Sequence, residues 1–141
     1  VAFRGRHNFV VLNRYPYNSG HLMIVPYRHV DALSRCTAAQ LHEMMRLAAR
    51  CENALRSAYA MEGMNVGMNP GASAGAGVLG HLHLHLVPRW TGDTNFMTVT
   101  GRTRVTPELL EETYAKLHRL LHARGRSASA GGARRRMRRP S

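Results

Sequence analysis

Three histidines at alternate positions form the most distinctive chemical feature of this sequence. His81, His83 and His85 alternate with three leucines in the stretch GHLHLHLVPRW, residues 80–90. Successive side chains of a β-strand point to opposite faces, so a strand would place the three imidazoles on one face and the leucines on the other. The leucine face can pack in a core, which leaves the imidazole face free to line a site.

The row of imidazoles has three competing interpretations. The first is simple polar alternation on an exposed strand. The second is a metal site, since histidine is a common zinc ligand. The first and third imidazoles lie about 13 Å apart along a strand, however, and the nearest following carboxylate, Asp93, is eight residues past His85. The third interpretation is a row of groups that contact a phosphate chain.

The phosphate interpretation fits the chemistry of imidazole best. A neutral imidazole is a good nitrogen nucleophile near pH 7, and an imidazolium is a good acid and charge partner. The central histidine can attack phosphorus while its neighbours donate to the phosphate oxygens, which supplies the positioning that nucleotidyl transfer requires. The preceding stretch PGASAGAGVLG, residues 70–80, is rich in glycine, so its backbone N–H groups can approach an anion closely. It lacks the lysine of a Walker loop.

The surrounding sequence predicts an α+β fold built on an antiparallel sheet of about five strands. A helix is expected at about residues 38–60, with Thr37 as N-cap and Gln40 completing a capping box. A shorter C-terminal helix is expected at 106–121, with Thr106 as cap, Pro107 at its first position and Glu108 in its first turn. Strands are expected at 7–13, 21–26, 64–69 and 81–89, the first two as a hairpin.

Charge and composition predict one domain, residues 1–123, followed by a disordered arginine-rich tail, residues 124–141. The tail carries seven arginines and no acid, and without it thirteen basic and eight acidic residues leave a net charge of +5. No apolar stretch approaches the roughly 18–20 residues of a membrane span, and no targeting segment is visible. Cys36 and Cys51 lack the spacing of a zinc site or a disulfide framework, so free thiols in a reducing cytoplasm are expected.

Several segments of the chain resemble the histidine-triad (HIT) superfamily of nucleotide hydrolases and transferases. HLHLHLV is similar to the family's His-φ-His-φ-His-φ-φ pattern, in which φ is an apolar residue. The segment LNRYPYNSGHLMIVPYRHV, residues 12–30, resembles the family's N-terminal hairpin, and GMNPGASAG, residues 67–75, resembles its third strand and phosphate loop. PRWTGDTNFM, residues 88–97, is similar to the bacterial branch, and most of all to actinobacterial diadenosine tetraphosphate phosphorylases.

The resemblance implies a role for each matching residue. His83 would attack the α-phosphorus, His85 would bind a non-bridging oxygen, and His81 would help to position the phosphate and the nucleophile. His21 matches a supporting histidine of the family. The remaining matches are substrate-binding positions: Asn13 for the ribose, Asn69 near the phosphates, and the loop residues Gly75, Ala76, Gly77 and Val78. Residues 76–80 carry no side-chain donor, so Ser73 or backbone N–H groups would have to supply the one that the family usually has.

The resemblance further implies the reaction and the partners. Dinucleoside polyphosphates such as diadenosine tetraphosphate would be cleaved by phosphate or water through a nucleotidyl-histidine intermediate, in a homodimer or higher homo-oligomer. No cofactor is required, apart from a divalent cation that can accompany the nucleotide. The alternatives are a Fhit-like hydrolase, a nucleoside phosphoramidase, an inactive nucleotide-binding relative, and a nucleic-acid-binding protein that uses the arginine tail.

Overall fold

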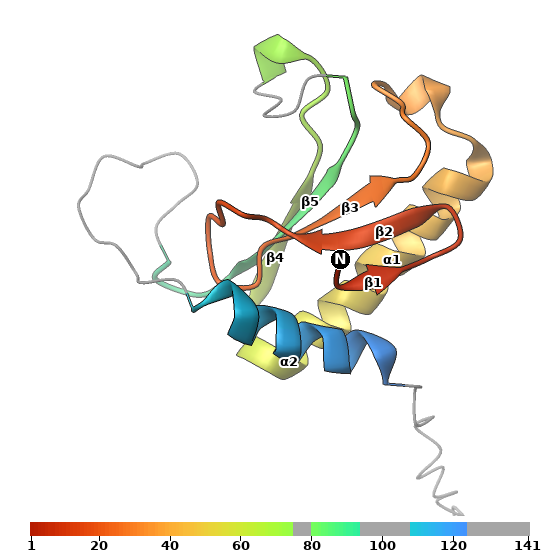
Figure 1. Cartoon of the computed structure of the whole chain (residues 1–141). Coiled ribbons are helices and arrows are strands. Elements are labelled where there is room, and N and C mark those ends of the chain that lie inside the picture. Colours follow the sequence, from red (N-terminus) through yellow and green to blue (C-terminus); the bar gives the residue numbers. More distant parts are fainter. Residues whose placement is uncertain (75–79, 94–107, 124–141) are drawn as a thin grey trace, which may run out of the picture.

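The protein folds as one antiparallel sheet with two helices, the α+β arrangement expected from the sequence. The computed structural model describes residues 1–74, 80–93 and 108–123. Within them, five strands form a sheet in the order β1-β2-β3-β5-β4, and the long helix α1 crosses one face of that sheet (Figure 1). The strands are β1 (Phe3–Arg4), β2 (Asn8–Leu12), β3 (Leu22–Pro26), β4 (Gly63–Gly67) and β5 (Leu84–Arg89).

Strands β2 and β3 form the expected hairpin, and β1 is an additional strand beside β2. β2 and β3 pair antiparallel through five residues, from Asn8 opposite Pro26 to Leu12 opposite Leu22. β1 was not predicted from the sequence, because two residues are too few to show an alternating pattern. It pairs with β2 and so extends the hairpin by one short strand at the sheet edge.

Helix α1 (Ala38–Tyr59) begins and ends close to the predicted positions. The capping box is confirmed: the Thr37 hydroxyl accepts from the Gln40 N–H at 3.2 Å, and the Gln40 side chain accepts from the Thr37 N–H at 2.8 Å. Such a reciprocal pair satisfies N–H groups that the first helical turn leaves unpaired. Ala60 ends the helix in the left-handed region, at φ 47°.

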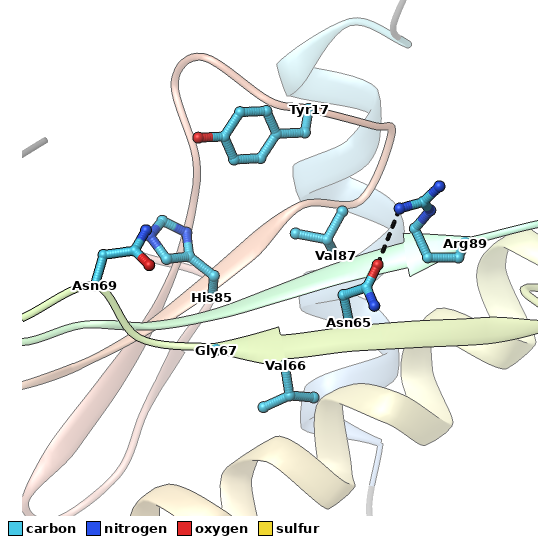
Figure 2. A pocket seen from close by; sticks show the side chains of 8 residues that line it. All are labelled: Tyr17, Asn65, Val66, Gly67, Asn69, His85, Val87 and Arg89. Atoms are coloured by element: carbon cyan, nitrogen blue, oxygen red, sulfur yellow. Dashed lines mark hydrogen bonds between the residues drawn. The ribbon is translucent and has the colours of Figure 1, made fainter. Parts of the chain in front are cut away.

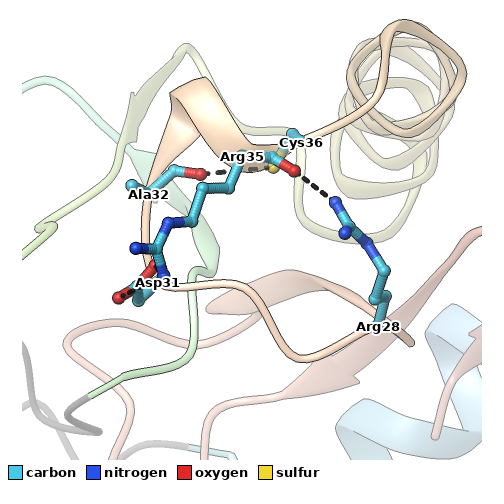
Figure 3. A network of polar contacts seen from close by, with 5 residues as sticks. All are labelled: Arg28, Asp31, Ala32, Arg35 and Cys36. Atoms are coloured by element: carbon cyan, nitrogen blue, oxygen red, sulfur yellow. Dashed lines mark hydrogen bonds and ion pairs between the residues drawn. The ribbon is translucent and has the colours of Figure 1, made fainter.

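The segment between β3 and α1 is held by its own polar contacts (Figure 3). Arg28 donates to the carbonyl of Arg35, whose guanidinium pairs with Asp31 at 3.1 Å. Cys36 donates from its thiol to the carbonyl of Ala32 at 3.7 Å, and Leu33–Arg35 form a short 3-10 turn. Both cysteines are free, as predicted, and burial raises the pKa of the Cys51 thiol to about 12.

Helix α2 (Leu110–His122) starts later than predicted. Thr106 and Pro107 lie outside the described residues, and the N-cap is Leu109, whose side chain makes no capping bond. Glu108 therefore precedes the N-cap and is not in the first turn. Its carboxylate accepts from Tyr59 Oη at 2.6 Å and from Lys116 Nζ at 2.6 Å, which ties the start of α2 to the end of α1.

The hydrophobic core lies between the sheet and the two helices. Alternate residues of the central strands face it, and α1 contributes a stripe at helical spacing. Its fully buried members include Val10, Leu22, Ile24, Leu55, Leu86, Leu117 and Leu121. No helix in the described ranges is both long and apolar enough to cross a membrane.

Strand β5 begins at Leu84, three residues later than predicted, and the reason lies in the neighbouring strand. β3 pairs with β5 only from Leu22 opposite Leu86 to Ile24 opposite Leu84. The next residue of β3 to face β5 would be Pro26, which has no N–H to donate to the ladder. Leu82 instead donates its N–H to the carbonyl of Val30 at 2.6 Å. His81 and His83 therefore precede the paired part of the strand.

Gly20 fixes the turn between β2 and β3 against α1. Its φ is +80°, and a Cβ at this position would lie 2.9 Å from Leu55 Cδ2 and 3.0 Å from the Tyr59 ring. A side chain here would meet both a strained backbone and two packed neighbours. Only glycine therefore lets His21, the next residue, enter the buried side of the turn.

Candidate active site

The histidine run keeps its two faces although only His85 lies within β5. Leu82, Leu84 and Leu86 are buried, whereas the three histidines are half-buried. The rings of His83 and His85 lie in edge contact, with centroids 4.7 Å apart. The predicted division into a core face and an imidazole face is therefore present.

His83 has one ring nitrogen held by the main chain. Its Nδ1 lies 3.0 Å from the carbonyl oxygen of His81. A carbonyl only accepts, so Nδ1 carries a hydrogen, and in the neutral ring Nε2 then keeps the lone pair. Among the described residues, Nε2 of His83 has no hydrogen-bond partner. This is the tautomer in which Nε2 can act as a nucleophile.

His81 acts on its neighbours through both side chain and backbone. Its Nε2 lies 2.9 Å from the carbonyl oxygen of Pro26 and therefore donates to it, and its ring packs against His29 at 5.0 Å. The carbonyl of the same residue orients His83. The structure thus connects His81 to the end of β3 and to the ring of His83.

His85 is oriented by the buried His21, the supporting histidine implied by the resemblance. His21 Nε2 lies 2.9 Å from His85 Nδ1. On its other side, His21 Nδ1 accepts from the Tyr17 backbone N–H at 3.3 Å and lies 3.3 Å from Asn13 Nδ2. These donors place the hydrogen of His21 on Nε2, so Nδ1 of His85 accepts and Nε2 of His85 carries its hydrogen.

Burial keeps this pair of rings neutral. The pKa of His21 is lowered to about 4, first by burial and then by repulsion from His85 and His83. The pKa of His85 is lowered as well, by partial burial and then by His83. Two neutral imidazoles with defined hydrogens form a chain from the buried turn to His85.

A cavity of about 510 Å³ opens beside His85 (Figure 2). β4 and β5 form its floor, with Gly67 directly opposite His85 in the ladder and Asn65 opposite Val87. Asn69, one of the predicted residues, lines this cavity together with Tyr17, whereas the Val66 side chain points to the other side of β4 in Figure 2. Since Gly67 has no side chain, the cavity reaches the His85 ring without obstruction.

Two polar residues of this cavity, Arg89 and Asn65, were missed in the sequence. Arg89 Nη1 donates to Asn65 Oδ1 at 3.0 Å, and its Nε pairs with Asp93 at 2.9 Å, which also accepts from Asn18 Nδ2 at 2.9 Å. The period-two pattern contained this signal, because His85, Val87 and Arg89 continue the same strand face. The guanidinium lines the cavity, and its charge is paired with that of Asp93.

The other predicted substrate-binding residues take three different places. Asn13 lies against His21, and its side-chain oxygen accepts from the Tyr15 N–H at 2.9 Å. Ser73 is exposed on the short turn Ala72–Ala74 and does not line the cavity of Figure 2. Gly75, Ala76, Gly77 and Val78 lie outside the described residues.

Metal binding was the second interpretation of the histidine run. Among the residues that the structure describes, no group of three or more histidine, cysteine, aspartate or glutamate side chains is placed to hold a metal ion. The histidines instead use their ring nitrogens on one another and on the backbone, at Pro26 and at His81.

Comparison with known families identifies this arrangement. The sequence profile of the HIT domain matches residues 1–92, which include all three histidines of the run. The chain belongs to the HIT family. The matched residues contain His81, His83 and His85, which we call the triad below, and the sheet with one long helix is the fold of that family.

Relatives in the HIT family include nucleotide-cleaving enzymes. The chain is 45% identical over 113 residues to "AP-4-A phosphorylase" of Mycobacterium tuberculosis, covering 80% of this chain and 58% of that protein. It is 26% identical over 93 residues to "Bis(5'-nucleosyl)-tetraphosphatase [asymmetrical]" of Schizosaccharomyces pombe, covering 66% and 50%. The chain thus spans between 50% and 58% of the length of these relatives.

Solved HIT structures match the fold along most of the chain. A zinc-bound histidine triad family protein from Mycobacterium smegmatis superposes with a TM-score of 0.68 at 25% identity, covering 85% of this chain and 81% of that one. Together with the family match, this agreement confirms the predicted fold.

Proposed function

We propose that this HIT protein cleaves dinucleoside polyphosphates by nucleotidyl transfer to Nε2 of His83. The observation that carries the proposal is the hydrogen bond from His83 Nδ1 to the His81 carbonyl, 3.0 Å long, which leaves Nε2 with a lone pair. The neighbouring cavity next to His85 offers space for a nucleotide and its phosphates.

In the first step, the His83 Nε2 lone pair forms a bond to the α-phosphorus of the substrate. The bond from that phosphorus to the bridging oxygen breaks, and its electron pair leaves with the nucleoside polyphosphate, which is ATP when the substrate is diadenosine tetraphosphate. The imidazole of His83 becomes positively charged in this intermediate. Its Nδ1–H bond to the His81 carbonyl stabilises that charge without any rearrangement.

In the second step, an oxygen of inorganic phosphate or of water attacks the same phosphorus. The bond from phosphorus to nitrogen breaks and its electron pair returns to His83 Nε2. Phosphate gives ADP, and water gives AMP and releases a proton. The 45% identity to a protein named a phosphorylase favours phosphate as the acceptor.

His85 and the cavity residues would stabilise charge on the transferred phosphate. The neutral ring of His85 carries its hydrogen on Nε2, so it can donate to a non-bridging oxygen. Asn69 adds an amide at the same cavity, and Arg89 adds a guanidinium that is paired with Asp93. Donors aligned before the reaction lower its barrier most effectively, because they need no reorganisation.

The decisive experiment follows the products of diadenosine tetraphosphate labelled in adenosine. Incubation with inorganic phosphate is expected to yield labelled ADP, and incubation without phosphate to yield none. His83→Ala should abolish turnover and the trapped nucleotidyl-protein, whereas His122→Ala, on the exposed face of α2, should retain both. Full turnover by His83→Ala would exclude the mechanism, and AMP in place of ADP beside the released ATP would make the protein a hydrolase.

The same intermediate serves the two alternatives within the family. A nucleoside phosphoramidase differs only in the leaving group, which is an amine in place of a polyphosphate. Parallel assays with adenosine 5′-phosphoramidate and diadenosine tetraphosphate therefore separate these activities.

Removal of residues 124–141 tests nucleic-acid binding independently. Loss of salt-sensitive DNA binding with retained turnover would assign that binding to the tail.

A homodimer in the cytoplasm completes this proposal. In the described residues, β4 pairs only with β5 and lies at the sheet edge, where its outer backbone groups can pair with a second copy. Val66 on this strand is 47% exposed. Sedimentation analysis should give twice the chain mass, and Val66→Lys should shift the measured mass toward that of the monomer.

The free cysteines Cys36 and Cys51 support the cytoplasmic part of the proposal, because free thiols fit a reducing compartment.

A further inference from the structure

A second cavity, of about 630 Å³, lies between the β1–β2 turn and the first half of α1. It shares no lining residue with the cavity beside His85. Its walls come from residues 3–7 and from one face of α1 between Ala39 and Arg50. Volumes of this size are typical of small-molecule sites, so the chemistry of the lining decides what could enter.

The single carboxylate of this lining, Glu43, is already occupied. Its oxygens accept from the backbone N–H groups of Arg6, His7 and Asn8 at 2.7–2.8 Å, and from Asn8 Nδ2 at 3.0 Å. Burial alone would raise the pKa of Glu43, but these hydrogen bonds outweigh it and lower the pKa below its usual value. The carboxylate is therefore ionised, and it binds the backbone N–H groups of the turn.

Gly5 lets Glu43 reach this position. A Cβ on residue 5 would lie 2.9 Å from the Asn8 carbonyl oxygen and 3.0 Å from the Glu43 carboxyl group. The turn and the helix therefore meet closely only with glycine here. The result is a wall that carries several positive side chains around one hydrogen-bonded carboxylate.

Four arginines surround the cavity: Arg4, Arg6, Arg46 and Arg50. Arg50 is held in place, since its guanidinium lies 4.4 Å from the Phe3 ring centroid and donates to the Leu121 carbonyl. Among the described residues, the guanidinium groups of the other three make no hydrogen bond or ion pair. His7 and His42 also line the cavity and add no negative charge.

We propose that this cavity is a second ligand site, which binds a phosphate chain such as tripolyphosphate or the triphosphate of a nucleotide. The excess of positive charge requires an anion with several charges, and the planar fork of arginine suits phosphate oxygens. Convergence of four cations on one concave surface concentrates such an anion there. The site is independent of the triad, and its occupancy does not depend on nucleotidyl transfer.

Titration of the isotope-labelled full chain with tripolyphosphate, followed by amide NMR, tests this proposal. Chloride at matched ionic strength is the blank. We expect saturable shifts of the backbone amides of residues 4–8 and 42–50, with an affinity that falls as salt rises. Shifts at the His85 amide report binding at the triad separately. Absence of saturable shifts at residues 4–8 and 42–50 overturns the proposal.

Two double variants with the same charge change sharpen the result. Arg6→Gln with Arg46→Gln should weaken binding at the second site by about tenfold or more while the His85 shifts persist. Arg35→Gln with Arg56→Gln removes two exposed arginines outside this cavity and should leave binding unchanged. Equal losses in both variants would show a general charge effect and overturn the site.

A second titration, with ATP, distinguishes the two sources of the phosphate chain. Affinities of ATP and tripolyphosphate within a factor of about three indicate a site that reads the phosphates alone. A much tighter ATP complex, accompanied by shifts with adenosine, indicates a nucleotide site. Either result supports the phosphate-chain proposal, whereas adenosine binding without tripolyphosphate binding contradicts it.

Discussion

His21 Nε2 lies 2.9 Å from His85 Nδ1, which joins a buried turn residue to the last histidine of the triad. Both rings are kept neutral, and the donors behind His21 determine where each hydrogen sits. A residue 64 positions earlier in the sequence therefore controls which nitrogen of His85 can donate.

Removal of this contact should lower catalysis without removing the nucleophile. In His21→Ala, His85 loses its ring partner, so we expect kcat to fall about tenfold or more while KM changes less. His21→Gln keeps an N–H that can reach His85 and should restore part of the loss. Steady-state assays with diadenosine tetraphosphate measure both constants. Equal kcat for His21→Ala and the unchanged protein would contradict a positioning role.

The same residue should make folding sensitive to acid. Its pKa is lowered to about 4 in the folded protein, against 6.5 for an ordinary histidine. Between these values the unfolded chain binds more protons, so stability falls as pH falls through that window, by roughly 3 kcal/mol in total. Urea unfolding at about pH 7 and about pH 4.5 should show a smaller difference for His21→Gln. His85 contributes in the same direction.

A side chain at Gly67 should obstruct the cavity. Gly67 faces His85 across the ladder, and a Cβ there meets nothing within 4 Å, so valine can enter the space without disturbing the strand. We expect about tenfold lower kcat/KM for Gly67→Val with unchanged stability. Gly63→Val, on the same strand and outside the cavity, is the matched control. Equal activity of both variants would show that substrate does not use this space.

Gly20 should be required for stability for two separable reasons. Gly20→Ala meets both a φ of +80° and the Leu55 and Tyr59 side chains, so we expect a loss of about 1–3 kcal/mol in the free energy of unfolding. Gly92→Ala meets a similar φ of +81° with nothing within 4 Å, and so should cost less. Urea denaturation compares the two. A larger loss at Gly92 would contradict the close approach to α1.

Local patterns predicted most of the fold and the centre of the site. The capping box at Thr37, the hairpin around residues 13–21 and the two faces of the histidine run follow from spacing alone. The end of the β3–β5 ladder could also have been predicted, since Pro26 has no N–H. It was missed because strand pairing depends on a partner 56 positions away, opposite Leu82.

Contacts between distant segments account for the rest. Glu43 reads as an ordinary charged residue of an amphipathic helix, yet it accepts three backbone N–H groups of the β1–β2 turn. Glu108 reads as a first-turn acid, yet it ties α2 to Tyr59. Neither the role of Glu43 nor that of Glu108 produces a periodic pattern in the sequence, because each depends on contacts with a distant segment. The places of Gly75–Val78 and of the tail at 124–141 remain predictions.

The residues just before β5 are anchored to Pro26, the last residue of β3, and to Val30 in the segment that follows it. Leu82 binds the Val30 carbonyl and His81 binds the Pro26 carbonyl, while the ladder itself starts only at Leu84. We therefore expect small changes in residues 26–30 to displace His83, the proposed nucleophile, without altering the register of any strand. For protein engineering, substitutions in residues 26–30 therefore offer a way to change the substrate range without altering the hydrophobic core.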